Sequence, residues 1–304
     1  MSVRTVRRVP VAMLLAVALV VAMVGCSDSG GGLGGGGGGD SKKVTIGYIA
    51  WDEDIAVTEV WKQLLEAEGY TVETKQLEAA ALFSGVANGD LDMFMDAWLP
   101  SAHGNYWKKY GEKVEDLGVW YQSGDSGLAV PEYMKDVDSH SDLKKHASEF
   151  DGKITGIEPS SASMRILKDE VMPAYGLKGS MKAVPSSTPA MLAALDKAYK
   201  AKDPVVVTMW RPHWAFSEYD IKYLKDPKNA WGDPDRIHTI AAPDFVKDNS
   251  EVTGWVKNFE LTPDQLQGLE KQIQDAGGNN KAPEAVKQWI ADNKSLTDKW
   301  TSSN

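Results

Sequence analysis

Apolar and polar residues follow the same order of strand and helix patterns in the two halves of the chain. In the first half, apolar runs predict strands at 44–49, 71–77 and 91–95, and three- and four-residue spacing predicts helices at 55–68 and 79–87. The second half predicts strands at 153–157, 181–185 and 205–209, with helices at 161–175 and 188–201. Such alternation is typical of parallel sheets flanked by helices. The pattern therefore predicts an α/β protein with two similar lobes and a cleft between them.

The C-terminal part carries only helical signals. Thr262-Pro263-Asp264-Gln265 is a capping box that opens a helix reaching residue 274, and 283–292 predicts another. Trp255, Trp289 and Trp300 are expected to pack this tail onto a lobe. We expect lobe 1 to comprise 44–147 and 246–304, and lobe 2 to comprise 148–245.

The N-terminus has the features of an export signal. Basic residues precede an unbroken run of fourteen apolar residues at 11–24, which is short for a membrane span and typical of a signal peptide. The run ends in Met23-Val24-Gly25-Cys26, which resembles the lipobox of bacterial lipoproteins. We therefore expect a signal peptide at 1–26 with lipidated Cys26 at its end, followed by a flexible Gly/Ser tether at 27–43. This predicts a protein anchored by lipid on the extracytoplasmic face of the cell membrane, exported by either the Sec or the twin-arginine route.

Composition and motifs narrow the function. The formal net charge of −10 becomes −13 when the three arginines of the signal are lost, which argues against a nucleic-acid partner. Cys26 is the only cysteine, so the chain has no intramolecular disulfide and the mature domain has no other thiol. No phosphate-binding loop, zinc-protease motif or hydrolase serine motif occurs, and we expect neither a cofactor nor a metal. A secreted enzyme acting on a small molecule remains the alternative from another class.

Three tryptophans stand where predicted strands end. Trp51 precedes a helix, while Trp98 and Trp210 each begin a Trp-x-Pro turn after a strand. In open α/β sheets, ligands bind beyond the carboxyl ends of the strands. Quaternary ammonium ligands carry a positive charge but have no hydrogen-bond donor, and the faces of indole rings attract such cations. Each ring alone could equally pack in the core, but together they predict a cage for such a cation.

Four stretches resemble the glycine-betaine-binding proteins of osmoprotectant ABC importers. They are Tyr48-Ile49-Ala50-Trp51-Asp52, Asp96-Ala97-Trp98-Leu99-Pro100-Ser101-Ala102-His103, Gly156-Ile157-Glu158-Pro159 and Trp210-Arg211-Pro212-His213-Trp214. The resemblance covers residues 43 to 300, in order. It implies a periplasmic-binding-protein fold, with two lobes that are joined by two crossovers and close over the ligand like a hinge. It also implies the permease subunits of an ABC importer as partners.

The resemblance assigns a role to each site residue. It implies that Trp51, Trp98 and Trp210 form the ammonium cage and that His103 binds the ligand carboxylate. Backbone amides corresponding to Ala162 and Ser163 complete the carboxylate clamp. Many relatives have glycines in this loop, whereas residues 160–164 here contain none.

The identity of the ligand stays open among three hypotheses. Glycine betaine or a related betaine fits the cage and the clamp, and His103 favours a carboxylate. Choline fits the cage but needs an acceptor for its hydroxyl, for which Asp52 or Asp96 is a candidate. Carnitine, proline betaine and dimethylsulfoniopropionate form the third group.

Asp52-Glu53-Asp54 could contact a metal or bound cation, although acidic residues at a helix start are more simply explained by the helix dipole.

Overall fold

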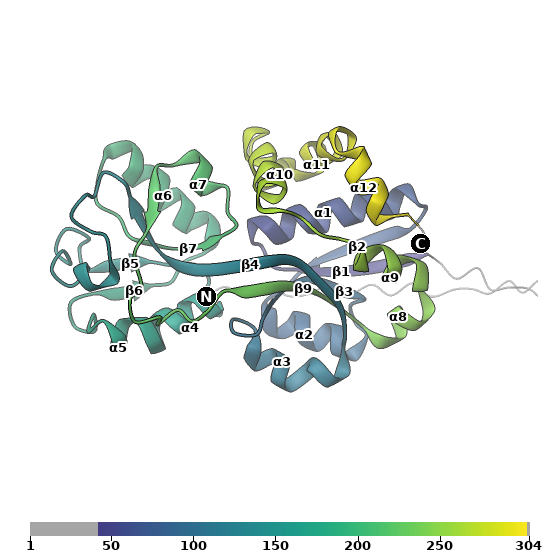
Figure 1. The fold of residues 1–304 in the computed structure, drawn as a ribbon, viewed down its shortest axis with the longest axis horizontal. Helices are drawn as coiled ribbons and strands as arrows, with labels where there is room; N and C mark the ends of the chain where they lie inside the picture. The colour runs from purple at the N-terminus through teal and green to yellow at the C-terminus, as the bar shows by residue number, and fades with distance from the viewer. Residues whose placement is uncertain (1–41, 303–304) are drawn as a thin grey trace, which may run out of the picture. The chain divides into compact units, whose positions relative to one another are not determined.

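One sheet runs through both halves of the chain in the computed structural model, which describes residues 42–302 (Figure 1). Its strands are β1 (Lys43–Tyr48), β2 (Thr71–Gln76), β3 (Met93–Leu99), β4 (Glu115–Pro131), β5 (Lys153–Thr155), β6 (Lys182–Val184), β7 (Val207–Arg211), β8 (Ile221–Tyr223) and β9 (Asp235–Ala241). They lie in the order β2-β1-β3-β9-β4-β7-β5-β6, and β8 pairs with β4. The α/β class expected from the alternating pattern is confirmed.

The first lobe contains β1, β2 and β3 in parallel, as the sequence predicted. Its helices are α1 (Asp52–Ala67), α2 (Ala79–Asn88) and α3 (Gly104–Tyr110). In Figure 1, α1 lies on one side of the sheet and α2 with α3 on the other. The apolar face of α1 is buried through residues such as Val57, Trp61 and Leu65, which anchors its N-terminal turn at the carboxyl end of β1.

The second lobe repeats the parallel order with β5, β6 and β7. Its helices are α4 (Ala162–Ile166), α5 (Met172–Ala174), α6 (Thr188–Ala201) and α7 (Ala215–Glu218). The single helix predicted over 161–175 contains a π-helical turn, Leu167–Val171, between α4 and α5. Ser161 caps α4 by accepting a hydrogen bond from the backbone N–H of Met164. The cap places the start of α4 at the end of the lobe that faces α1.

Two antiparallel strands that the sequence patterns did not reveal connect the lobes. The first part of β4 pairs with β9 beside β3, and its last part pairs with β7 and β8. The change of partner occurs after Gly124, next to several irregularities in the β4–β9 register. Because of these strands the sheet is mixed, rather than mostly parallel in each lobe. The lobe limits expected from the sequence, at 147/148 and 245/246, stay a prediction.

Helices make up the C-terminal part of the first lobe (Figure 1), and among them α10 and α11 pack against α1. They are α8 (Pro243–Asp248), α9 (Ser250–Lys257), α10 (Pro263–Asp275), α11 (Ala282–Asp292) and α12 (Lys294–Trp300). Thr262 and Gln265 form the predicted capping box of α10. Trp255, Trp289 and Trp300 are buried, and Trp300 packs with Trp61 of α1, so the predicted packing role of these tryptophans is confirmed.

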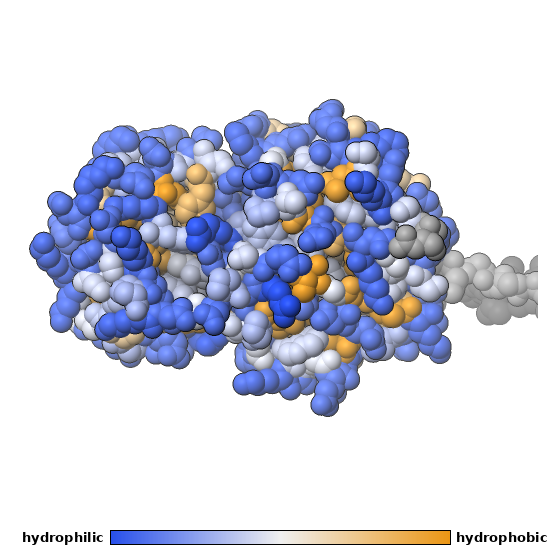
Figure 2. Space-filling view, in the orientation of Figure 1, coloured by the Kyte–Doolittle hydropathy of each residue, from blue (hydrophilic) through white to orange (hydrophobic). Residues whose placement is uncertain are grey.

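The described residues include no helix suited to crossing a membrane, and the face drawn in Figure 2 shows no large apolar patch. No helix within 42–302 combines the length and the hydropathy that a membrane crossing requires. The face drawn in Figure 2 is largely hydrophilic, and its apolar residues lie in small separate areas. Scattered apolar residues of this kind are normal on a protein surface. Cys26 and the predicted signal peptide lie outside the described residues.

Candidate functional site

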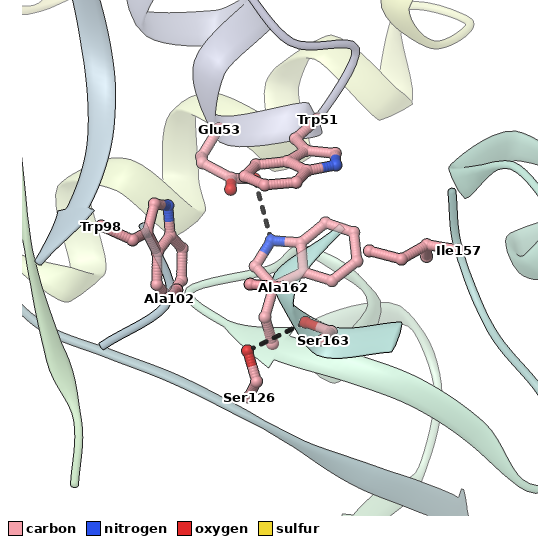
Figure 3. Close-up of a pocket in the computed structure, with 9 residues that line it drawn as sticks. Trp51, Glu53, Trp98, Ala102, Ser126, Ile157, Ala162 and Ser163 are labelled. Carbon is pink, nitrogen blue, oxygen red and sulfur yellow. Dashed lines mark hydrogen bonds between the residues drawn. The ribbon is translucent and has the colours of Figure 1, made fainter. Parts of the chain in front are cut away.

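The three predicted tryptophans meet at one pocket between the lobes. Trp51 is the residue before α1, Trp98 lies near the end of β3, and Trp210 lies in β7. All three are at most 9% exposed. They line one common space. The remaining lining residues are Glu53, Ala102, Ser126, Ile157, Ala162 and Ser163. In Figure 3, Trp51, Trp98 and Ile157 surround this space from three sides, and Ser126 and Ser163 close it below.

The indole N–H groups of two of these tryptophans are bonded to buried carboxyl groups. Trp98 Nε1 donates to Asp96 Oδ1 at 3.0 Å, because residues two apart in a strand share a face. Trp210 Nε1 donates to Glu53 Oε2 at 2.9 Å, across the space between the lobes. Trp51 and Trp210 have their ring centroids 6.3 Å apart and are inclined at 45°. The carboxyl groups therefore fix the directions in which two of the rings present their faces.

Gly124 permits the position of Trp98. A Cβ atom at this glycine would lie 2.5 Å from Trp98 Cζ3. No real Cβ approaches an aromatic carbon so closely, so any side chain here would displace the ring. The absence of a side chain on β4 is therefore part of the site, and it occurs where β4 passes from one lobe to the other.

His103 lies beside the tryptophan pocket, not on its wall. It precedes α3, and its ring stacks on Trp51 with centroids 6.0 Å apart and an interplanar angle of 6°. It lines a neighbouring space with Glu78, Glu158, Ser160, Ser161 and other residues. Trp51 and Ala162 line both spaces. A ligand that extends past Trp51 and Ala162 could therefore reach His103.

The protonation of His103 follows from its surroundings. Burial lowers the pKa of His103 to about 3, so the ring is neutral at physiological pH. Its Nδ1 accepts a hydrogen bond from the backbone N–H of Trp98 at 3.0 Å. A neutral imidazole that accepts through Nδ1 carries its proton on Nε2. His103 is thus a hydrogen-bond donor without a charge.

Ala162 and Ser163 are the first two residues of α4 and line the tryptophan pocket. Backbone N–H groups at the start of a helix have no acceptor within the helix and favour an anion. None of residues 160–164 has a positive φ, so this loop does not require glycine. The hydroxyl of Ser163 bonds to that of Ser126 at 3.2 Å.

The acidic run at the start of α1 is almost completely buried. Asp52, Glu53 and Asp54 are at most 3% exposed, and Asp96 and Glu270 are buried nearby. Burial, together with the charge of Asp96, raises the pKa of Glu53 well above its usual range. Asp54 accepts hydrogen bonds from the Ile49 N–H and the Thr58 hydroxyl, so its role is to hold the start of α1. The helix-dipole explanation is therefore incomplete.

Glu53 is the pocket residue that sequence reasoning did not assign. Its place two residues after Trp51, within the acidic run, was the available signal. Asp52 and Asp96, the candidates for a choline hydroxyl, do not line the tryptophan pocket; Asp96 binds Trp98, and Asp52 faces His213. Within residues 42–302, no group of three or more histidine, cysteine, aspartate or glutamate residues could hold a metal ion.

Comparison with known proteins places the chain among transport proteins. Residues 42–292 match the sequence model of a family described as the substrate-binding domain of the ABC-type glycine betaine transport system. The glycine betaine/carnitine transport binding protein GbuC of Listeria monocytogenes is 34% identical over 161 residues, which are 53% of this chain and 53% of that protein. The match thus spans about half the length of that relative.

Two solved structures share the fold over the whole described region. Lactococcal OpuAC, in its closed-liganded conformation with glycine betaine, is 36% identical, with a TM-score of 0.78 over 86% of this chain and 99% of that chain. A choline-binding protein of an ABC transporter, in complex with choline, is 25% identical, with a TM-score of 0.75 over 86% of this chain and 91% of that chain.

Proposed function

The chain belongs to the family of substrate-binding domains of ABC-type glycine betaine transport systems, and on that premise we propose that it binds glycine betaine or a related betaine for an importer. The ligand ammonium lies between Trp51, Trp98 and Trp210, and its carboxylate is held by His103 with the amides of Ala162 and Ser163. This function is binding and delivery without chemical turnover.

The observation that carries the proposal is the convergence of three indole rings on one buried space. A fully methylated ammonium has no N–H to donate, so ring faces are the surfaces that attract it, with about 0.5–2 kcal/mol from each ring. The indole N–H groups of Trp98 and Trp210 are engaged with carboxyl groups, which leaves the faces available to the ligand. The carboxyl group of Glu53 on the same space adds further attraction for a cation.

The neighbouring space supports a carboxylate at the other end of the ligand. His103 presents an Nε2–H donor, and α4 presents the free amides of its first turn. Trp51 and Ala162 border both spaces, which gives the two ends of a betaine a continuous path. Hydrogen bonds to a charged acceptor are the stronger kind, so a neutral histidine is sufficient.

Choline is the second candidate, and Glu53 is the observation that favours it. Glu53 Oε1 is buried on the pocket wall without a hydrogen-bond partner among the described residues. It could accept the choline hydroxyl or neutralise the cation. Choline has no carboxylate, however, and would leave the donors of His103 and α4 unused.

The cellular setting completes the proposal. The family places the domain outside the cytoplasm, and the lipobox-like Met23-Val24-Gly25-Cys26 supports lipidation of Cys26 as the membrane anchor. The permease subunits of an ABC importer are the expected partners. In cells, Cys26→Ser should release the protein from the membrane fraction; a variant that stays membrane-bound without lipid would contradict the anchor.

Calorimetric titration of the chain from residue 27 with glycine betaine, choline and dimethylsulfoniopropionate tests the ligand. We expect tight one-to-one binding of glycine betaine and weak binding of choline. Tight choline binding with no betaine binding would transfer the proposal to choline. If none of the three compounds releases or absorbs heat, the proposal of an ammonium cage is contradicted. The Trp51→Ala variant is the matched control, because heat that it still shows does not come from binding in the pocket.

A further inference from the structure

Two neighbouring residues at the start of α1 contact the turn that follows β7, on the other lobe. Glu53 Oε2 accepts a hydrogen bond from Trp210 Nε1 at 2.9 Å, and Asp52 Oδ2 lies 3.3 Å from His213 Nε2. All four side chains are at most 4% exposed. Both contacts join segments more than 150 residues apart, as the 157 residues between Glu53 and Trp210 show. They are therefore made only when the lobes are together.

One first-lobe partner, Asp52, is held in place by other residues of the first lobe. Asp52 Oδ1 accepts hydrogen bonds from Gln274 Nε2 of α10 and from Asn279 Nδ2, both at 3.2 Å. Its other oxygen points to His213. The Nδ1 of His213 accepts from the backbone N–H of Ala215 at 3.0 Å, so its Nε2–H is the donor aimed at Asp52. The α1 turn thus offers one prearranged acceptor, Asp52, to the approaching lobe, and beside it Glu53, whose hydrogen bond is to Trp210.

The two contacts also determine where the third cage wall stands. The Trp210 ring lies at right angles to His213, with centroids 4.5 Å apart. The indole N–H of Trp210 is therefore bound by Glu53, and its ring packs against the imidazole that faces Asp52. Trp98, by contrast, receives its carboxyl partner from its own strand.

We propose that Asp52 and Glu53 form a latch that closes the lobes on the Trp210–His213 turn and positions Trp210 as a wall of the cage. They act as positioning residues, through Trp210 and His213. The lobe-closing part of this inference is independent of the ligand, and its effect on affinity rests on the proposed betaine function. A third contact, from the Ser160 hydroxyl to Glu78 Oε2, joins the lobes beside His103 and lies outside the latch.

The distance between the lobes measures the latch directly. The chain from residue 27 has no cysteine, so Lys197→Cys on α6 and Lys287→Cys on α11 introduce a single pair of labels at exposed positions, one in each lobe. Distances from paired spin labels are recorded without and with glycine betaine. The backgrounds are wild type, Glu53→Ala, Glu53→Gln, Asp52→Asn and, as a matched control, the exposed α1 residue change Glu66→Ala.

Without ligand, Glu53→Ala and Asp52→Asn should each lower the ratio of closed to open molecules by roughly tenfold, because the first loses the hydrogen bond to Trp210 and the second loses the carboxylate oxygen that faces His213. Glu53→Gln keeps an oxygen that can accept from Trp210 and should retain most of the closed population. Asn at position 52 keeps one oxygen for Gln274 and Asn279 but presents an amide N–H to the His213 donor. Unchanged distances in Glu53→Ala and Asp52→Asn, equal to those of Glu66→Ala, would overturn the latch.

A double-mutant cycle of Glu53→Ala with Trp210→Phe tests whether Glu53 acts through the indole N–H. Phenylalanine keeps a ring and removes the donor, so the two changes should be strongly non-additive in the closed fraction. Additive effects would contradict the assignment. If the distances respond to Glu53→Ala but the protein does not bind betaine, the proposed function is contradicted and the latch is not. If the protein binds betaine but the closed fraction does not change in Glu53→Ala and Asp52→Asn, the latch is contradicted and the proposed function is not.

Discussion

Trp98 and Trp210 are two walls of the same pocket that are positioned in different ways. Each lies near the end of a strand, precedes an X-Pro bond that is cis, and donates its indole N–H to a buried carboxyl group. The acceptor of Trp98 is Asp96, two residues earlier in the same strand, whereas the acceptor of Trp210 lies on the opposite lobe. One wall is complete within its lobe, and the other is completed by closure. A binding protein that must signal occupancy needs this asymmetry, because a cage finished in the open form could not distinguish the two states.

The largest expected effect separates the two tryptophans by stability. Trp98→Ala should lower the free energy of unfolding of the unliganded protein by about 3–5 kcal/mol, since it removes a buried aromatic from a formed core. Trp210→Ala should cost clearly less, because the open form does not depend on its closed-state contacts. Chemical denaturation without ligand measures both. Equal losses would show that Trp210 is as fully prearranged as Trp98.

The same pair of variants should lose affinity together. Each deletes one ring face, so titration with glycine betaine should show a loss of about 1–2 kcal/mol, around tenfold or more, for either. Unchanged affinity in Trp98→Ala would mean that this ring only packs.

Gly124 provides the next largest effect and acts on Trp98 alone. Gly124→Ala places a Cβ against the indole and should destabilise the protein by about 1–3 kcal/mol, the usual cost of overpacking, while weakening betaine binding. Trp98→Phe combined with Gly124→Ala should recover part of the stability, because the smaller ring leaves room. The comparison uses unfolding free energies of the two single variants and the pair. An absence of recovery would mean that the clash lies elsewhere.

His103 should distinguish ligands by their polar ends. His103→Ala is expected to weaken glycine betaine by about 1.5 kcal/mol and choline much less, because only the betaine has a carboxylate for Nε2–H. Because burial holds the pKa of His103 near 3, this ring stays neutral and contributes no pH dependence to affinity between pH 5 and 8. Titrations of both ligands at these two pH values test this. Equal losses for both ligands would assign His103 a structural role.

The smallest expected effect concerns Glu270, a buried carboxyl group whose pKa is influenced by Glu53 and Asp52. Burial, with the charges of Glu53 and Asp52, raises the pKa of Glu270 well above its usual value. The folded protein therefore binds this proton more tightly than the unfolded chain does. The resulting stability is present below the unfolded pKa and is lost as pH rises through the folded pKa.

Glu270→Gln removes this ionisation at nearly constant volume. It should raise stability by about 1 kcal/mol at pH 8, with a smaller change at pH 5, and so flatten the fall in melting temperature between these values. The exposed Glu66→Gln serves as the control. A pH profile identical to wild type would show that Glu270 binds its proton equally in the folded and the unfolded state over this range.

Much of the fold was predictable because local patterns determine it. The parallel strands and most of their helices follow from apolar periodicity, and the cap of α10 follows from Thr262 and Gln265. The strands β4 and β9 were missed, since they change partner and register as they cross between lobes and carry no uniform alternation. The predicted strand at 91–95 ends too early, because β3 continues through Trp98 to Leu99.

The residues of the site also fall into those that the sequence predicted and those that it did not. Trp51, Trp98 and Trp210 were recognisable because bulky rings at strand ends are conspicuous, and the structure brings them to one pocket with Ala162 and Ser163. Glu53 was not assigned, because an acidic residue in the first turn of a helix has an ordinary explanation in the helix dipole. Its burial depends on Trp210, which arrives from the other lobe.

The amino-acid sequence by itself determined the periodic elements, the caps and the set of rings available for a cation, because these depend on neighbouring residues. Only the tertiary structure decided which carboxyl group orients each ring, that His103 stands behind Trp51, and that Gly124 leaves room for Trp98. These features depend on contacts between residues far apart in the chain. Their energies arise from burial and geometry that no local pattern encodes.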